Sequence, residues 1–170
     1  IGMGGVLDTG RLKAFIAQDL NVSAKDVDAM IIGAHADTMV PLSRFTTVKG
    51  TPITDLLSSD KIKALEERAR KGGEEIVKLL QAGSAYYAPG AAVAEMADSI
   101  LNDRKRIFPC SVYCDEEYGV KGCYIGVPVK LGKNGVEEII ELKINKEEKE
   151  AFDKSVEHVK SLVETAKKFL

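Results

Sequence analysis

The chain contains 170 residues, of which 45% are hydrophobic and 29% are charged, and its formal net charge at pH 7 is −2. These values are typical of a soluble globular protein, and they exclude the strongly basic footprint of a protein that binds nucleic acid or an anionic membrane. No apolar run approaches the ~18 residues of a membrane span and no signal peptide is recognisable, so we expect a cytoplasmic protein.

A chain of this length can bury roughly 70% of its unfolded surface around one core. The sequence contains no internal repeat and no low-complexity linker, so a single domain over residues 1–170 is predicted. Its three cysteines, Cys110, Cys114 and Cys123, form no C-x-x-C pair and have no histidine nearby in the sequence. We therefore predict buried or half-buried reduced thiols, with neither a disulfide framework nor a metal site.

The first predicted helix begins at Asp8 or Thr9, because either side chain can cap it. Its apolar residues recur at helical spacing, at Leu12, Phe15, Ile16 and Leu20. We expect Asn21 to end it. Residues 27–33, VDAMIIG, predict a buried strand that stops at a glycine, and residues 34–50 contain turn and extended segments.

From Thr54 to Gln81 the apolar period is again helical, and residues 58–60 are expected to divide this segment into a short and a long helix. The pair Gly72-Gly73 falls inside the long helix. Each glycine there costs about 1 kcal/mol relative to alanine, so the pair indicates close backbone packing or a kink. Residues 91–101 are apolar on most sides and predict a well-buried helix.

After Arg106 the apolar period changes to two, which predicts strands at residues 107–113, 123–132 and 136–144. Asn134-Gly135 predicts a tight hairpin between the last two strands. Asn145, with Glu148 three residues later, predicts the start of a final helix. That helix has a charged face and one apolar stripe, formed by Phe152, Val156, Val159, Val163, Ala166 and Leu170.

The order of helix, short strands, helices, antiparallel hairpins and helix indicates an α+β fold in which antiparallel sheets pack against helices. The opening stretch IGMGGVLDTGR, residues 1–11, could suggest a dinucleotide phosphate loop of the form G-x-G-x-x-G. Gly2 and Gly4 fit that pattern, but Leu7 occupies the third glycine position and no strand precedes Ile1. This stretch is therefore not predicted to hold a pyrophosphate.

Three side chains are candidates for chemistry. His35 follows a predicted buried strand on a glycine-flanked loop, whereas His158 is expected to be a solvated residue of the last helix. Asp8 and Arg11 are one helical turn apart, so they leave the same face of the first helix. An aspartate can fix the tautomer of a histidine, and an arginine can bind a carboxylate through two parallel hydrogen bonds. The alternative is a helix cap at Asp8 with an exposed Asp8–Arg11 ion pair, worth under about 1 kcal/mol.

Five stretches, in order along nearly the whole chain, resemble the lactate/malate dehydrogenase family: LDTGR at 7–11, GAHADTMVPL at 33–42, TTVKGTPI at 46–53, GSAYYAPGAAVAEM at 83–96 and YGVKGCYIGVPVKLGKNGVEEIIEL at 118–142. The resemblance is greatest to the malate dehydrogenases of lactate-dehydrogenase-like type. It covers only the C-terminal, substrate-binding half of the family's chain, and the N-terminal Rossmann domain that binds NAD is absent from this sequence.

The resemblance implies an NAD-dependent malate dehydrogenase that interconverts malate and oxaloacetate by hydride transfer. His35 matches the family's acid/base histidine, which also faces the nicotinamide, and Asp8 matches the aspartate paired with it. Arg11 matches the arginine that binds the substrate carboxylate. Ala85 and Pro89 match positions that line the substrate and nicotinamide pocket, although both are equally compatible with a buried helix start.

The sequence departs from the family pattern at Ala36, where glycine is usual after the histidine, and at Gly10, where alanine is more common. The loop that selects malate or lactate belongs to the absent half, so a lactate or other 2-hydroxy-acid dehydrogenase is the alternative. A second alternative is a non-catalytic oligomerisation fragment, because the family forms dimers and tetramers. The chain starts at Ile1, in the middle of a family motif. We therefore expect a proteolytic or engineered fragment that is inactive alone.

Overall fold

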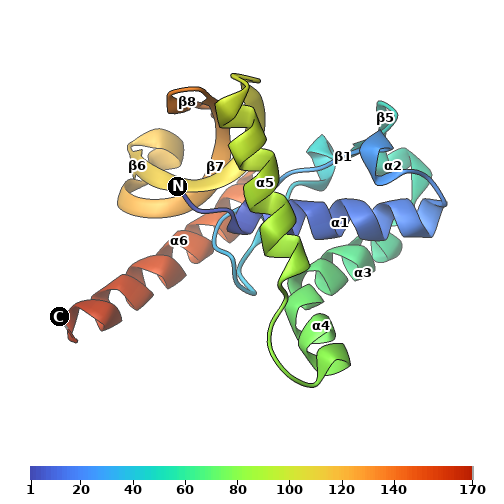
Figure 1. Cartoon of the computed structure of the whole chain (residues 1–170), viewed down its shortest axis with the longest axis horizontal. Coiled ribbons are helices and arrows are strands. Elements are labelled where there is room, and N and C mark those ends of the chain that lie inside the picture. The colour runs from blue at the N-terminus through green and yellow to red at the C-terminus, as the bar shows by residue number, and fades with distance from the viewer. Residues whose placement is uncertain (170) are drawn as a thin grey trace.

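The computed structural model describes residues 1–169. Helix α1 (Gly4–Leu20) runs through the middle of the molecule, and α5 (Tyr87–Leu101) crosses it (Figure 1). A sheet of three strands lies near the N-terminal end of α1, and several short strands and helices lie near its C-terminal end. Helix α6 (Lys146–Lys167) packs near the sheet and extends away from the rest of the molecule (Figure 1).

Helix α1 begins earlier than predicted. Its N-cap is Met3, and no side chain caps it, so the predicted cap at Asp8 or Thr9 is wrong. Gly4 and Gly5 lie in its first turn, and position 5 has space only for glycine, because a Cβ there would lie 2.4 Å from the carbonyl oxygen of Pro109. The predicted end is confirmed, since Asn21 adopts the left-handed conformation (φ 52°) that closes many helices.

The predicted strand over residues 27–33 is two short strands that pair with different partners. Strand β1 (Val27–Asp28) pairs antiparallel with β4 (Thr47–Val48), and β2 (Ile31–Ile32) pairs antiparallel with β3 (Val40–Pro41). Strand β5 (Thr51–Pro52) extends the first of these sheets. Two 3-10 turns lie within this region, η1 (Ala24–Asp26) and η2 (Ser43–Phe45).

The larger sheet is antiparallel in the order β6-β7-β8, as predicted. Its strands are β6 (Arg106–Asp115), β7 (Lys121–Gly132) and β8 (Gly135–Ile139), with the 3-10 turn η3 (Glu117–Gly119) between the first two. The hairpin at Asn134-Gly135 is confirmed, because Gly132 pairs with Gly135. The last strand ends at Ile139 rather than at residue 144.

The predicted break at residues 58–60 separates α2 (Ile53–Leu56) from α3 (Ser59–Arg70), whose N-cap is the Ser58 side chain. A second break at Lys71 starts α4 (Gly72–Leu80), which confirms the kink expected from the glycine pair. Helix α5 was predicted to be well buried, and this prediction is wrong. It buries Ala92, Met96 and Ser99, whereas Val93 and Leu101 are exposed.

The start of α6 is confirmed, because Asn145 and Glu148 form a reciprocal capping box. Only the first half of its apolar stripe packs against the protein, through Phe152 and Val156. Val163 and Ala166 are exposed, and Leu170 lies outside the described residues. His158 is exposed, as expected.

Helix α1 contributes to both buried apolar clusters of the molecule. Val6 and Leu7 pack with the β6-β7-β8 sheet, α5 and α6, whereas Leu12 and Ile16 pack with the short strands and α3. The predicted α+β class with antiparallel sheets is confirmed. Among residues 1–169, no helix is both long and apolar enough to cross a membrane.

The three cysteines are buried and form no disulfide, which confirms the predicted reduced thiols. Cys114 and Cys123 lie opposite each other on β6 and β7. Burial raises the pKa of the Cys110 thiol and of the Cys114 thiol to about 11 and also raises the pKa of Cys123. Because the thiolate is the reactive form of cysteine, these residues are packing residues of the core.

Candidate functional site

The structure brings Asp8, Arg11 and His35 together at the N-terminal end of α1. The His35 Nδ1–H donates to Asp8 Oδ2 at 2.6 Å, and Arg11 Nη1 lies 3.7 Å from Asp8 Oδ1. The Asp8 side chain is only 1% exposed and that of Arg11 10%. The alternative of an N-cap with an exposed ion pair is therefore wrong, because Asp8 lies inside the helix and its pair with Arg11 is buried.

The loop that carries His35 is fixed to the sheet on one side. Gly33, at the beginning of this loop, exchanges two backbone hydrogen bonds with Gly126 of β7, of 2.8 and 3.1 Å. Its φ of +90° and the Ser155 hydroxyl, which would lie 2.7 Å from an added Cβ, leave space only for glycine. The sheet thus determines where the loop begins.

Helix α6 holds the same loop from the other side. The Ala34 N–H donates to Ser155 Oγ at 2.8 Å, and the Ser155 hydroxyl donates to Thr38 Oγ1 at 3.3 Å. Ser155 has no exposed surface. Ser155 is not among the site residues predicted from the sequence. Its only signal is that a polar side chain lies among the buried positions Phe152 and Val156 of the last helix.

Two further residues of α1 set its distance from the loop. Thr9 Oγ1 accepts a 3.1 Å hydrogen bond from the N–H of Ile31 in β2, which ties the residue beside Asp8 to the segment that leads to His35. Gly4 lies against the His35 side chain, since a Cβ there would be 2.6 Å from His35 Cβ and 3.0 Å from the ring atom Cγ. Sequence reasoning missed both roles, because each depends on a residue distant in the chain.

The electrostatics of the cluster favour a protonatable imidazole. The hydrogen bond to Asp8 raises the pKa of His35 above 6.5; partial burial opposes this effect, the Asp8 charge adds to it, and the Arg11 charge opposes it. The His35 side chain is 52% exposed, and Nδ1 is the ring nitrogen that bonds Asp8. Nε2 is therefore left to exchange a proton with a bound molecule near neutral pH.

The guanidinium of Arg11 has unused hydrogen-bonding capacity. Within residues 1–169, its Nε is buried with no hydrogen-bond partner, and so is Asp8 Oδ1. A buried donor without a partner is costly, and a ligand oxygen would satisfy it. The cluster thus combines a proton-transfer group with an arginine suited to a planar carboxylate.

The other two predicted site residues lie in the segment that joins α4 to α5. Ala85 precedes α5 and Pro89 lies in its first turn, where the missing N–H of a proline breaks no helical hydrogen bond. Both are half-buried. No hydrogen bond or ion pair described for residues 1–169 joins either one to Asp8, Arg11 or His35, and their roles stay a prediction.

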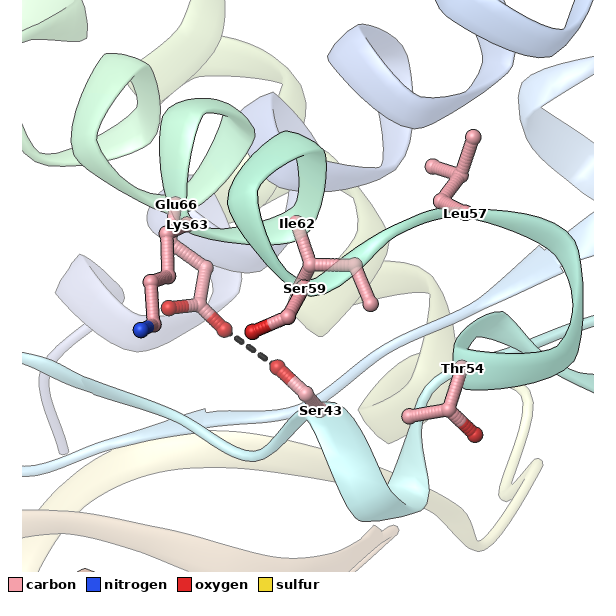
Figure 2. A pocket seen from close by; sticks show the side chains of 7 residues that line it. All are labelled: Ser43, Thr54, Leu57, Ser59, Ile62, Lys63 and Glu66. Carbon is pink, nitrogen blue, oxygen red and sulfur yellow. Dashed lines mark hydrogen bonds between the residues drawn. The ribbon is translucent and has the colours of Figure 1, made fainter.

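A surface cavity of about 300 Å³ lies elsewhere, between η2, α2 and α3 (Figure 2). Its lining residues are Ser43, Thr54, Leu57, Ser59, Ile62, Lys63 and Glu66. The Ser43 hydroxyl donates to the Glu66 carboxylate, as Figure 2 shows. The lining includes no histidine and none of the predicted site residues. Among residues 1–169, no group of three or more His, Cys, Asp or Glu side chains is placed to hold a metal ion.

Known proteins with the same domain support the resemblance seen in the sequence. The family model described as lactate/malate dehydrogenase, alpha/beta C-terminal domain, matches residues 5–170. A malate dehydrogenase of Rhodopirellula baltica is 54% identical over 165 residues, which make up 97% of this chain and 52% of that protein. The chain thus spans about half the length of the curated relatives it matches.

Solved structures agree with this result. The malate dehydrogenase from Salinibacter ruber is 51% identical, with a TM-score of 0.94 over 96% of this chain and 53% of that one. The lactate dehydrogenase from Eimeria maxima, solved with NADH and oxamate, is 40% identical, with a TM-score of 0.93 over 97% of this chain and 53% of that one. With a family match over residues 5–170 and this fold, the chain belongs to the lactate/malate dehydrogenase family, as its α/β C-terminal domain.

Proposed function

We propose that the chain is the substrate-binding and proton-transferring domain of an NAD-dependent malate dehydrogenase that interconverts malate and oxaloacetate. The observation that carries this proposal is the 2.6 Å bond between His35 and the buried Asp8, with Arg11 on the same face of α1. Relatives about half identical to this chain bear the name malate dehydrogenase, which supports malate as the substrate.

The three side chains divide the work. In malate oxidation, His35 Nε2 accepts the proton of the substrate hydroxyl; in the reverse direction it returns that proton to the carbonyl oxygen of oxaloacetate. Asp8 holds the ring so that Nε2 faces the substrate, and its charge stabilises the imidazolium that forms. Arg11 binds a substrate carboxylate through parallel hydrogen bonds and so orients the reacting carbon.

The described residues fit only the nicotinamide end of NAD. The exposed part of His35 and the half-buried Pro89 would face the nicotinamide, whereas residues 1–11 lack the third glycine of a phosphate loop. When bound, NAD supplies the hydride acceptor, and a solved lactate dehydrogenase of the family contains NADH. Because these residues provide only this part of the cofactor site, we predict that the 170-residue chain alone does not oxidise malate with NAD.

The proposed enzyme is a cytoplasmic homo-oligomer, a dimer or a tetramer, to which this chain contributes one domain over residues 1–170. Several large apolar side chains of α4 and α5 are exposed, which is the feature expected of a surface that other parts of an assembly cover. The buried, unpaired thiols suit a reducing compartment.

Lactate or another 2-hydroxy acid is the second candidate substrate. It is favoured by the lactate dehydrogenase from Eimeria maxima, which matches this fold as well as the malate enzymes do. Rates with malate, lactate and other 2-hydroxy acids, measured on the full-length enzyme, decide between these substrates. A non-catalytic oligomerisation fragment is disfavoured. In such a fragment His35 would be expected to lie too far from Asp8 for a hydrogen bond, whereas the two are 2.6 Å apart.

The test of the proposed function is His35→Asn in the full-length enzyme that carries this domain. Because asparagine cannot take up the substrate proton, we expect turnover to fall by about 10²–10⁴-fold while NADH binding, measured by fluorescence, is unchanged. His158→Asn is the matched control: it changes an exposed histidine of α6 and should leave turnover unaffected. Full turnover in His35→Asn would reject the assigned role.

A further inference from the structure

The first residue of α4, Gly72, is buried and lies directly against the side chain of Arg11. A Cβ at Gly72 would be 2.9 Å from Arg11 Cδ, 3.3 Å from Nε and 3.7 Å from Cζ. A real Cβ is essentially never found closer than 3.0 Å to another heavy atom, so a larger residue here would displace the arginine. The backbone of Gly72 does not itself require glycine, because its φ lies outside the left-handed region.

The neighbouring Gly73 provides a contrast within the same helical turn. A Cβ at Gly73 would lie 3.7 Å from Arg11 Nη1 and 3.9 Å from Nη2, which is ordinary van der Waals contact. Both glycines have the same intrinsic cost in a helix. Gly72 is buried and Gly73 is half-buried, and only a Cβ at Gly72 would overlap Arg11, so the close contact is specific to Gly72.

Arg11 has little else to hold it in place. Among residues 1–169, its only ion-pair partner is Asp8 Oδ1 at 3.7 Å, and its Nε makes no hydrogen bond. The orientation of the guanidinium therefore depends on the shape of the space around it. The backbone at Gly72 forms one wall of that space.

A bridge across the kink keeps this wall in position. Arg68 of α3 pairs with Glu75 of α4 through two bonds of 2.9 and 3.1 Å, and its guanidinium stacks over the ring of Phe15 in α1, 4.0 Å from the centroid. Arg68 thus links α1, α3 and α4. This link fixes the start of α4 beside the helix that carries Arg11.

We propose that Gly72 is a positioning residue for Arg11: its lack of a side chain leaves the guanidinium in the orientation that receives the substrate carboxylate. This inference rests on the proposed function, in which Arg11 binds that carboxylate. It assigns the α3–α4 break a part in substrate binding, although no residue of the break contacts the reacting atoms.

The test compares Gly72→Ala with Gly73→Ala in the full-length enzyme. For Gly72→Ala we expect the KM for oxaloacetate to rise by roughly tenfold or more, because a displacement of about 1 Å in a binding group has effects of this size. The KM for NADH should not change, and the pH midpoint of the reaction should stay above 6.5, since the His35–Asp8 bond that mainly raises the pKa of His35 is untouched. Gly73→Ala should stay within about twofold of the parent. Equal behaviour of the two variants would overturn the proposal.

A double variant shows whether Gly72 acts through Arg11. In the Arg11→Ala background, where the overlapping atoms are gone, Gly72→Ala should add less than about twofold to the KM. If Gly72→Ala alone fails to fold, recovery of folding in the double variant supports the contact. A further large loss, or continued failure to fold, in that background contradicts it. An unchanged KM in Arg11→Ala alone would instead refute the proposed function.

Discussion

The His35 loop and the α4–α5 region differ in how the rest of the domain holds them. The loop is fixed from three sides, by Gly126 of the sheet, Ser155 of α6 and Asp8 of α1. The α4–α5 region instead exposes large apolar side chains, at Val77, Leu79, Leu80, Tyr86, Tyr87, Val93 and Leu101. The domain thus completes the geometry of its proton-transfer group by itself but leaves the apolar surface of α4 and α5 uncovered.

This difference agrees with a chain that spans about half of its relatives. A catalytic hydrogen bond needs rigid support close to it, and buried polar contacts supply that support locally. A surface that another domain or subunit covers has no such need. Variants of the two regions should therefore differ in kind: those near the loop change catalysis or stability, and those at the exposed apolar side chains of α4 and α5 change association.

The largest effect is expected for Asp8→Asn in the full-length enzyme. An asparagine NH₂ can donate to Nδ1 and so stabilise the tautomer with its proton on Nε2, which cannot accept the proton of malate. Turnover should fall by about 10²–10⁴-fold, as in other enzymes that lose such an aspartate. Stopped-flow or steady-state rates of malate oxidation measure this loss directly.

The pH profile of the same variant checks the cause. Asp8 raises the pKa of His35, and malate oxidation needs the neutral ring, so kcat/KM for malate should decline as the pH falls through a midpoint above 6.5. In Asp8→Asn this midpoint should move to lower pH. The raised pKa also means that the pair stabilises the fold fully below pH 6.5 and loses this contribution as the pH rises through the midpoint. An unshifted midpoint would show that Asp8 does not control His35.

A smaller effect is expected for Ser155→Ala. The change removes the acceptor of the Ala34 N–H and leaves that donor without its partner, which costs about 1–3 kcal/mol where water cannot replace it. The free energy of unfolding, from urea titration, should decrease by about this amount, and kcat should fall with it because the loop loosens. Ser161→Ala, at an exposed position of the same helix, is the control. Equal stability of the two variants would mean that the loop does not depend on α6.

The sequence was sufficient to predict the three clustered side chains, because Asp8 and Arg11 are one helical turn apart and the family motifs include His35. It did not predict what supports them. Ser155 bonds Ala34 across 121 residues, and Thr9 bonds Ile31 across 22, so neither contact leaves a periodic signal.

Two errors in the predicted helices have the same physical origin. The helix start was predicted at Asp8 or Thr9, yet α1 begins at Gly4, and its two opening glycines leave space for His35 and Pro109, which lie against the backbone. Helix α5 is apolar on most sides, but periodicity counts apolar residues and does not tell whether this domain or another part of the protein covers them. Long-range packing, not local propensity, decided both cases.

The smallest effect on folding is expected for Leu79→Lys on α4. Leu79 is 76% exposed, so its replacement should change the free energy of unfolding by no more than about 0.5 kcal/mol. A charge in the exposed apolar surface should nevertheless weaken self-association of the 170-residue chain, measured by sedimentation velocity over a range of concentrations. Leu162→Lys, at an exposed position of α6, provides a comparison outside this surface. If both variants associate equally, the α4–α5 region is not the surface that the rest of the assembly covers; if Leu79→Lys unfolds the chain, that region is part of the domain's own core.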